Sequence, residues 1–212
     1  MKKYDLYLFD FDGTLFETIH ALEIVFKVSY KAVGIDFDPS KTVEFSRIQL
    51  GDGYKQYQAD PNKWEDFVNM INASLDYPEV IEATEPYFDT LKFINYAYKH
   101  HIPCGIVTSN NIKHVQEVLK FLNIPLDAFV VYVGNQECHK KKPDPEPIYK
   151  ALEIAKNKGL KTDKVAYVGD GIYDMVSAKR AGVDGYLIDR GSLPEDHQEY
   201  PVIKSLMDLF DE

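Results

Sequence analysis

The chain has 212 residues, of which 45% are hydrophobic, enough to bury the core of one large domain or of a domain with a small accessory one. Its formal net charge of −10 argues against nucleic acid as a partner, because an acidic protein repels a phosphate backbone. The two cysteines lack metal-binding or redox spacing, and no apolar stretch approaches the ~18 residues of a membrane span, so we expect a soluble, cytoplasmic protein with no membrane partner.

The first expected element is a buried strand, since residues 6–11 form an apolar run rich in Tyr, Leu and Phe. Asp10 and Asp12 lie at the end of this run, and Gly13 and Thr14 follow at once. Residues two apart in an extended segment point the same way, so the two carboxylates could share one pocket. Their charges repel each other unless a cation or a proton lies between them.

A helical insertion follows this strand. Residues 18–34 and 64–75 have the spacing of helices, turns with Pro, Gly and Asp separate the helical stretches, and residues 16–83 contain no clear strand. We interpret residues 16–83 as a small second domain, inserted into a core made of residues 1–15 and 84–212.

The chain beyond residue 86 alternates between helical and strand patterns. Because parallel strands need crossover connections, this alternation predicts an α/β fold. One helix should have Asp144 as its N-cap and Pro145 at its first position. The expected strands lie at residues 102–110, 129–134, 164–170 and 185–189, and the expected helices at residues 85–101, 111–124, 144–159, 174–182 and about 202–210.

Polar residues follow several of the expected strands. Ligands bind beyond the carboxyl ends of the strands in an open parallel sheet, so these residues should meet at one edge. Each residue alone has an ordinary interpretation as part of a turn, a helix cap or a solvated lysine loop. Pro143 should hold Lys142 in an extended conformation. The other residues are Asp10 and Asp12 after the first strand, Thr108, Ser109 and Asn110 after the second, and Asp170 and Asp174 after the fourth.

Four segments together resemble the signature motifs of the haloacid dehalogenase-like hydrolase superfamily: DFDGTLFET, GIVTSN, KKKPDP and VGDGIYDM, in this order. The helical insertion resembles the cap domain of the branch that contains phosphoglycolate phosphatase and β-phosphoglucomutase. The resemblance covers nearly the whole chain. It implies a Rossmann-like parallel sheet with helices on both faces and an inserted small α-helical cap domain.

The resemblance also implies a role for each matching residue. Asp10 would be the nucleophile that takes the phosphoryl group, and Asp12 the general acid and base. Thr108 would hold the transferring phosphate beside Lys142, and Asp170 would bind Mg²⁺. The implied phosphate-binding set is Asp10, Phe11, Asp12, Thr108, Ser109 and Lys142, and the implied metal set is Asp10, Asp12 and Asp170, with Asp174 in support.

The residue types agree with that chemistry. The four acids would repel a phosphate dianion, and Lys142 supplies a single positive charge, so a divalent cation is needed. No His or Cys lies at these strand ends, and an all-oxygen ligand set favours Mg²⁺ over Zn²⁺. A phosphorylated aspartate would divide one difficult displacement into two easier steps.

Two features of the motifs leave alternatives open. Gly171 stands where many members of the superfamily have a small hydroxyl residue, which weakens the argument for a polar contact there. Lys140 and Lys141 crowd Lys142, and Lys141 could contact the phosphate in its place.

The insertion contains two candidate specificity residues. Gly51 and Gly53 should bracket a turn, with Arg47 and Lys55 beside it. Arginine suits a carboxylate or a second phosphate, so this pair of cations could bind an anionic leaving group. A solvated Arg47 whose stem packs on the insertion is the simpler interpretation.

The expected function is a Mg²⁺-dependent phosphatase for a small phosphorylated metabolite, similar to phosphoglycolate phosphatase, that acts through an aspartyl phosphate. A β-phosphoglucomutase-like phosphomutase would use the same residues, but the arginine-serine pattern expected in its cap loop is not evident. A non-catalytic binding or regulatory module on the same scaffold is opposed by the intact acids. A dinucleotide-binding domain is disfavoured because no Gly-x-Gly-x-x-Gly follows the first strand. The sequence makes no prediction of the oligomeric state.

Overall fold

The computed structural model describes residues 4–210 and contains two compact units. One unit comprises the chain up to Glu17 together with the chain from Pro86 onward, and the other comprises Thr18–Glu85. The chain passes between the units through β2 (Phe16–Glu17) and β3 (Glu85–Pro86), which pair as a two-stranded sheet. The expectation of no strand within residues 16–83 is therefore wrong for β2, because the partner of this strand lies beyond that segment.

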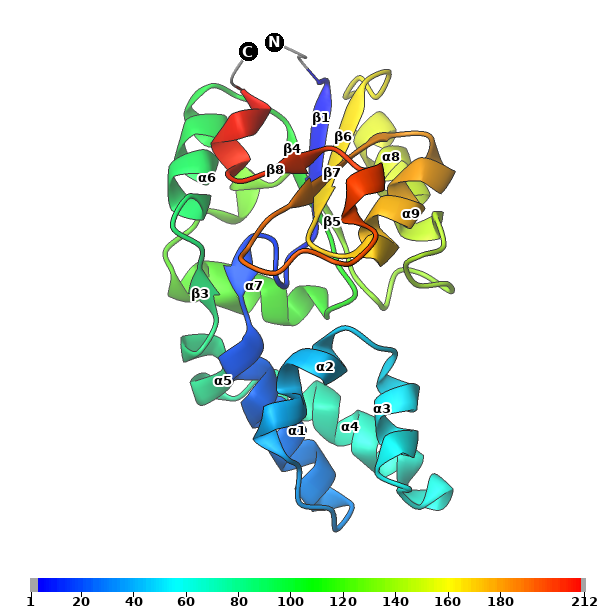
Figure 1. Ribbon diagram of the computed structural model, residues 1–212. Helices are drawn as coiled ribbons and strands as arrows, with labels where there is room; N and C mark the ends of the chain where they lie inside the picture. Colours follow the sequence, from blue (N-terminus) through cyan, green and yellow to red (C-terminus); the bar gives the residue numbers. More distant parts are fainter. Residues whose placement is uncertain (1–3, 211–212) are drawn as a thin grey trace. The chain divides into compact units, whose positions relative to one another are not determined.

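A six-stranded parallel sheet forms the centre of the first unit. Its strands are β1 (Leu6–Phe9), β4 (Cys104–Val107), β5 (Val131–Val133), β6 (Val165–Gly169), β7 (Asp184–Ile188) and β8 (Val202–Ile203). The strand order is β5-β4-β1-β6-β7-β8, so β1 lies between β4 and β6 (Figure 1). All four residues of β1 are buried, as a parallel strand covered on both faces requires. The predicted α/β fold with a Rossmann-like parallel sheet is confirmed.

Helices cover both faces of this sheet. They are α6 (Thr90–Lys99), α7 (Ile112–Phe121), α8 (Glu146–Asn157) and α9 (Ile172–Ala181). Successive residues of a strand point to opposite faces. Leu6 and Leu8 accordingly belong to one apolar cluster with Ile148 of α8 and Met175 of α9. Phe9 and Phe93 of α6 pack edge to face, with ring centroids 5.0 Å apart.

The C-terminal segment differs from the helix expected at residues 202–210. Val202–Ile203 forms the edge strand β8, and the Leu187 N–H donates to the Pro201 carbonyl at 2.9 Å. Only a short 3₁₀ helix, Leu206–Leu209, follows. The helix prediction is therefore wrong, because the free edge of β7 provides backbone partners that a propensity argument does not include.

The start of α8 differs by one position from the expected one. The helix begins at Glu146, and Pro145 is the N-cap residue instead of the first helical residue. The Asp144 carboxylate still accepts a hydrogen bond from the Glu146 N–H at 3.0 Å. Asp144 thus caps the helix from one residue further away than predicted.

The second unit is helical and is built around aromatic side chains. It contains α1 (Ile19–Ala32), α2 (Thr42–Ser46), α3 (Leu50–Gln56), α4 (Trp64–Ser74) and α5 (Pro78–Glu82). The ring of Tyr30 in α1 lies 4.7 Å from that of Phe67 in α4 and 5.3 Å from that of Phe37. Aromatic pairs at such separations stabilise a core beyond the area that they bury. Across residues 4–210, no helix is both long and apolar enough to cross a membrane.

The glycines of the insertion lie inside a helix. Gly51 and Gly53 both belong to α3, so the prediction that they bracket a turn is wrong. A Cβ atom at Gly53 would lie 3.0 Å from the ring of Phe45 in α2. Glycine at this position therefore allows α3 to pack closely against α2.

The hydroxyl of Tyr30 generates a test of this aromatic core. It is buried and has no hydrogen-bond partner among residues 4–210. Tyr30→Phe should leave the free energy of unfolding unchanged or raise it by up to about 1 kcal/mol, since it removes a desolvated group that makes no bond. Tyr54→Phe is the control: it removes a 2.7 Å hydrogen bond to the Asp60 carbonyl and should lower the free energy by about 1 kcal/mol.

Urea denaturation of the three proteins measures both values. A loss of more than about 1 kcal/mol in Tyr30→Phe would mean that this hydroxyl makes a stabilising contact.

Candidate active site

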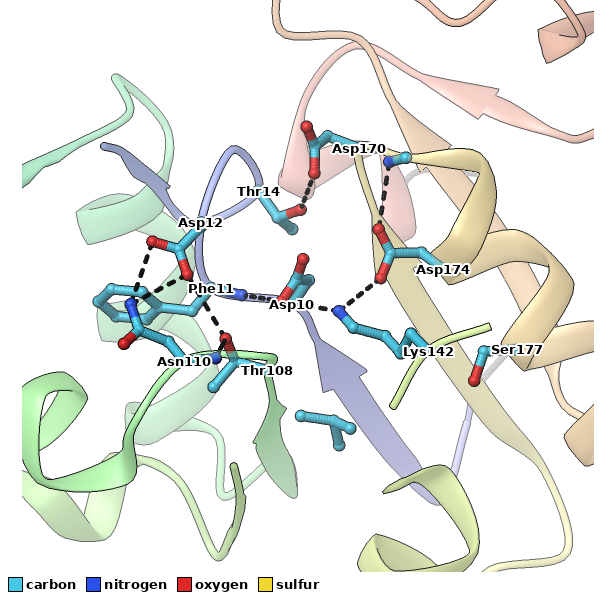
Figure 2. A network of polar contacts seen from close by, with 12 residues as sticks. Asp10, Phe11, Asp12, Thr14, Thr108, Asn110, Lys142, Asp170, Asp174 and Ser177 are labelled. Atoms are coloured by element: carbon cyan, nitrogen blue, oxygen red, sulfur yellow. Dashed lines mark hydrogen bonds and ion pairs between the residues drawn. The ribbon is translucent and has the colours of Figure 1, made fainter. Parts of the chain in front are cut away.

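The carboxyl ends of three neighbouring strands bring the predicted site residues together. Asp10 follows β1, Thr108 follows β4, and Asp170 follows β6. Phe9 is paired in register with Ile106 on one side and with Val168 on the other, so the three strands end at the same level. Figure 2 shows the resulting network of carboxylates, hydroxyls and one ammonium group.

Asp10 has one carboxylate oxygen held by the protein. Its Oδ1 accepts a hydrogen bond from the Phe11 N–H at 2.8 Å and lies 2.9 Å from the Lys142 Nζ. Its backbone N–H donates to the Val168 carbonyl at 2.9 Å, which fixes Asp10 at the end of β1. Oδ2 accepts no hydrogen bond from the part of the chain that the structure describes.

Lys142 is the lysine of the KKK run that reaches the acids. Its side chain is 6% exposed, and its Nζ lies 2.7 Å from Asp174 Oδ1 as well as close to Asp10. Lys140 and Lys141 are exposed, and the Lys140 Nζ lies 3.5 Å from Asp144 Oδ2. The buried position therefore belongs to the lysine that precedes Pro143.

Asp10, Asp170 and Asp174 form a group that could hold a metal ion. One carboxylate oxygen from each lies within 4.8 Å of the others. A Cβ atom at Gly13 would lie 2.5 Å from Asp170 Oδ2, and a Cβ at Gly169 would overlap Asp174, so glycines leave room for these acids. The donors are all carboxylate oxygens, which fits Mg²⁺.

The Asp12 carboxylate lies outside that group and has other partners. Asn110 Nδ2 donates to its two oxygens at 3.2 and 3.4 Å, and Thr108 Oγ1 lies 3.5 Å from Oδ2. The Thr108 hydroxyl also accepts a hydrogen bond from the Asn110 N–H at 3.0 Å. Ser109, between them, is exposed. Asn110 belongs to the expected strand end but is not among the predicted site residues, although it holds Asp12.

An arginine outside the predicted set, with a buried side chain, fixes the turn after Asp12. Arg190 donates to the Thr14 carbonyl through Nη2 at 2.7 Å and Nε at 3.1 Å, and its Nη1 lies 2.8 Å from Asp89 Oδ1. Its guanidinium carbon lies 4.2 Å from the ring centre of Tyr87. Arg190 follows β7 at the same edge of the sheet, so a search of every strand end would have found it.

The electrostatics of the site indicate an excess of negative charge. Burial raises the pKa of Asp10 well above its ordinary value, against the opposing effect of Lys142, and the charges of Asp174 and Asp170 raise it further. Burial alone would lower the pKa of Lys142, but Asp10 and Asp174 outweigh it and raise that pKa well above its ordinary value. Burial and then the Asp174 charge raise the pKa of Asp170 to about 6. A bound cation would relieve this excess.

The two specificity candidates lie in the unit of Thr18–Glu85. Arg47 is exposed and is the C-cap residue that follows α2. Lys55 is exposed in α3, with its Nζ 3.6 Å from Asp52 Oδ1. Their role in substrate binding stays a prediction.

Comparison with known proteins places the chain among hydrolases. A family model described as haloacid dehalogenase-like hydrolase matches residues 7–188. The chain is 30% identical over 186 residues to a phosphoglycolate phosphatase of Neisseria gonorrhoeae, a match that covers 82% of this chain and 75% of that protein. It is 26% identical over 216 residues to a pyrophosphatase PpaX of Halalkalibacterium halodurans, with 96% and 94% covered.

Solved structures share the fold. The haloacid dehalogenase-like family hydrolase of Streptococcus pneumoniae matches with a TM-score of 0.79 at 19% identity, over 99% of each chain. A HAD-superfamily hydrolase of Geobacter sulfurreducens matches with a TM-score of 0.74 at 18% identity, over 97% of each chain.

Gly13 generates the first prediction about this site. Its φ is +70°, and Gly182 has a similar φ of +73° but no atom within 4 Å of the place that a Cβ would take. Gly182→Ala should lower the free energy of unfolding by about 1–2 kcal/mol, the cost of a left-handed backbone for alanine. Gly13→Ala should lower the free energy of unfolding by roughly 1–3 kcal/mol more than Gly182→Ala does, because it also displaces Asp170. Urea denaturation with EDTA measures both, and equal losses would contradict the close contact with Asp170.

The raised pKa of Asp170 predicts a pH dependence of the metal-free protein. The folded state keeps this proton up to about pH 6, whereas an unfolded aspartate releases it near the ordinary value of 3.8. The folded state thus binds more protons between these values, so the Asp170 contribution to stability should fall as pH rises from about 4 to about 6. Asp170→Asn lacks this proton equilibrium. In EDTA, the free energy of unfolding of this variant minus that of wild type should therefore be greater at pH 7.5 than at about pH 4. A difference that does not change with pH would contradict the raised pKa of Asp170.

Proposed function

The chain belongs to the haloacid dehalogenase-like hydrolase family, and on that basis we propose that it is a Mg²⁺-dependent phosphatase for a small phosphorylated metabolite. The arrangement of Asp10 carries the proposal. The Phe11 N–H and the Lys142 ammonium hold Oδ1 of this buried carboxylate at 2.8 and 2.9 Å, so Oδ2 is the oxygen that remains for a reaction. The names of the relatives, phosphoglycolate phosphatase and pyrophosphatase, support a phosphorylated substrate.

The proposed reaction has two displacement steps. Oδ2 of Asp10 attacks phosphorus, the bond from phosphorus to the leaving oxygen breaks, and Asp12 gives a proton to that oxygen. Water then attacks the phosphorus of phosphorylated Asp10 while Asp12 takes the proton of the water. The first step releases the protonated leaving group, and the second releases inorganic phosphate and restores the Asp10 carboxylate and the proton on Asp12. Each step transfers the phosphoryl group between two oxygens in line.

The neighbouring residues support these steps. Asn110 and Thr108 hold the Asp12 carboxylate, which keeps it in one orientation for both proton transfers. The Thr108 and Ser109 hydroxyls and the Lys142 ammonium are the proposed phosphate-binding groups. Asp10 and Asp170 would hold Mg²⁺, with the Asp12 backbone and Asp174 in support. When bound, Mg²⁺ would supply charge neutralisation of the phosphoryl oxygens and alignment for attack.

We assign the role of a cap to the Thr18–Glu85 unit. Its exposed Arg47 and Lys55 carry positive charge in a chain whose net charge is −10. An anionic leaving group, such as the carboxylate of 2-phosphoglycolate or the second phosphate of pyrophosphate, has the chemistry that such cations bind.

Phosphate release tests the proposal directly. Pyrophosphate, 2-phosphoglycolate, sugar phosphates and nucleotides are incubated with the protein in Mg²⁺ or in excess EDTA. We expect phosphate release in Mg²⁺ but not in EDTA. The rate for Asp10→Asn should be at least about a thousandfold lower, because this change keeps the shape of the side chain but removes its nucleophilic oxygen. Asp163→Asn, at an exposed aspartate before β6, is the matched control and should retain full activity.

Three outcomes would contradict parts of the proposal. Full activity in EDTA would exclude the metal role, and a rate for Asp10→Asn within about tenfold of wild type would exclude the covalent step. Return of the phosphoryl group to a second sugar hydroxyl, without release of phosphate, would identify a phosphomutase.

A further inference from the structure

A buried tyrosine on β6 contacts the candidate active site from the core of the sheet. Tyr167 is fully buried, three residues before Asp170, and belongs to the apolar cluster under α8 and α9. Its hydroxyl lies 3.1 Å from the Lys142 Nζ, 3.0 Å from Asp174 Oδ1 and 3.1 Å from the Val107 carbonyl. A phenol in an apolar cluster needs such partners. Here two of the three are charged groups of the site.

Tyr167 completes the coordination of the Lys142 ammonium. An ammonium group has three N–H donors and no acceptor. The protein provides three acceptors around Lys142 Nζ: Asp174 Oδ1 at 2.7 Å, Asp10 Oδ1 at 2.9 Å and the Tyr167 hydroxyl at 3.1 Å. The first two alone would leave one donor of a buried charge unsatisfied, which is costly. The neutral hydroxyl therefore satisfies the third donor of this buried ammonium group.

The contact reaches the nucleophile through Lys142. Lys142 and the Phe11 N–H together hold Oδ1 of Asp10, and these two contacts orient Oδ2. Resting on the proposed function, we propose that Tyr167 is a positioning residue: its hydroxyl keeps Lys142 directed at Asp10, and so keeps Oδ2 aligned for attack on phosphorus. Tyr167 itself touches neither the substrate nor the reacting atoms.

Tyr167→Phe isolates the hydroxyl. The variant keeps the ring in the apolar cluster and its position 5.8 Å from the Lys142 Nζ. We expect kcat to fall at least tenfold and KM to change less than threefold, because alignment of Oδ2 acts in the bond-forming step. Tyr132→Phe on β5 is the matched control. It removes a phenol hydroxyl that donates to the Leu126 carbonyl at 2.6 Å and does not contact the acids of the site. The kcat of this variant should stay within twofold of the wild-type value.

A double-mutant cycle separates positioning from packing. Lys142→Met removes the ammonium, so adding Tyr167→Phe to it should change kcat by less than twofold further. A further tenfold loss in that background would overturn the proposal, because Tyr167 would then act without Lys142. A Tyr167→Phe rate within twofold of wild type, or an equal loss in Tyr132→Phe, would overturn it as well.

A readout without turnover distinguishes this proposal from the proposed function. If wild type releases no phosphate from any substrate, the proposed function fails. Urea denaturation of wild type, the two single variants and the double variant still measures the contact between Tyr167 and Lys142. The losses of stability from Tyr167→Phe and Lys142→Met should then be less than additive. Additive losses would overturn the assigned contact.

Discussion

The buried ammonium of Lys142 is the contact on which the rest of the candidate site depends. Its side chain is 6% exposed and lies between the carboxylates of Asp10 and Asp174. Carboxylates removed from water are unfavourable unless a positive charge and hydrogen bonds compensate them. One lysine compensates only part of the charge of the surrounding acids. The fold thus keeps the acids close together with an excess of negative charge, and such a group of carboxylates could hold a cation.

The parallel sheet converts this contact into a fixed geometry. β1 is buried along its whole length, and backbone hydrogen bonding to Val168 continues through Asp10, so the Asp10 carboxylate lies where a rigid strand ends. Side chains that alternate between two helix-covered faces prevent the strand from sliding by one residue, because such a shift would exchange Leu8 and Phe9 between unlike surroundings. The Thr18–Glu85 unit has a different core, in which aromatic rings around Tyr30 join short helices.

Local patterns were enough to predict the strands at the centre of the sheet and the acids at their carboxyl ends, since both can be recognised within short stretches of sequence. The errors arose where the partner of a residue lies in another element, outside the short stretch that predicts its own structure. Val202–Ile203 becomes a strand because β7 is free to pair with it, and Gly53 serves the close approach of Phe45. Arg190 contacts Thr14, and neither residue belongs to a motif that includes the other. Tyr167 has the pattern of an ordinary core residue, and only its hydroxyl contacts distinguish it.

The position of β1 between β4 and β6 has a consequence for the time at which these groups can assemble. A ribosome makes β1 well before it makes β4 and β6, so Asp10 leaves the exit tunnel while neither side of its strand has a neighbour. Lys142, Asp174 and then Arg190, which holds the Thr14 carbonyl, follow in that order. Until they emerge, Asp10 and the turn after it lack these contacts in the nascent chain. Asp10 and the turn after it are therefore made early but acquire their final surroundings late, when nearly the entire sheet is complete.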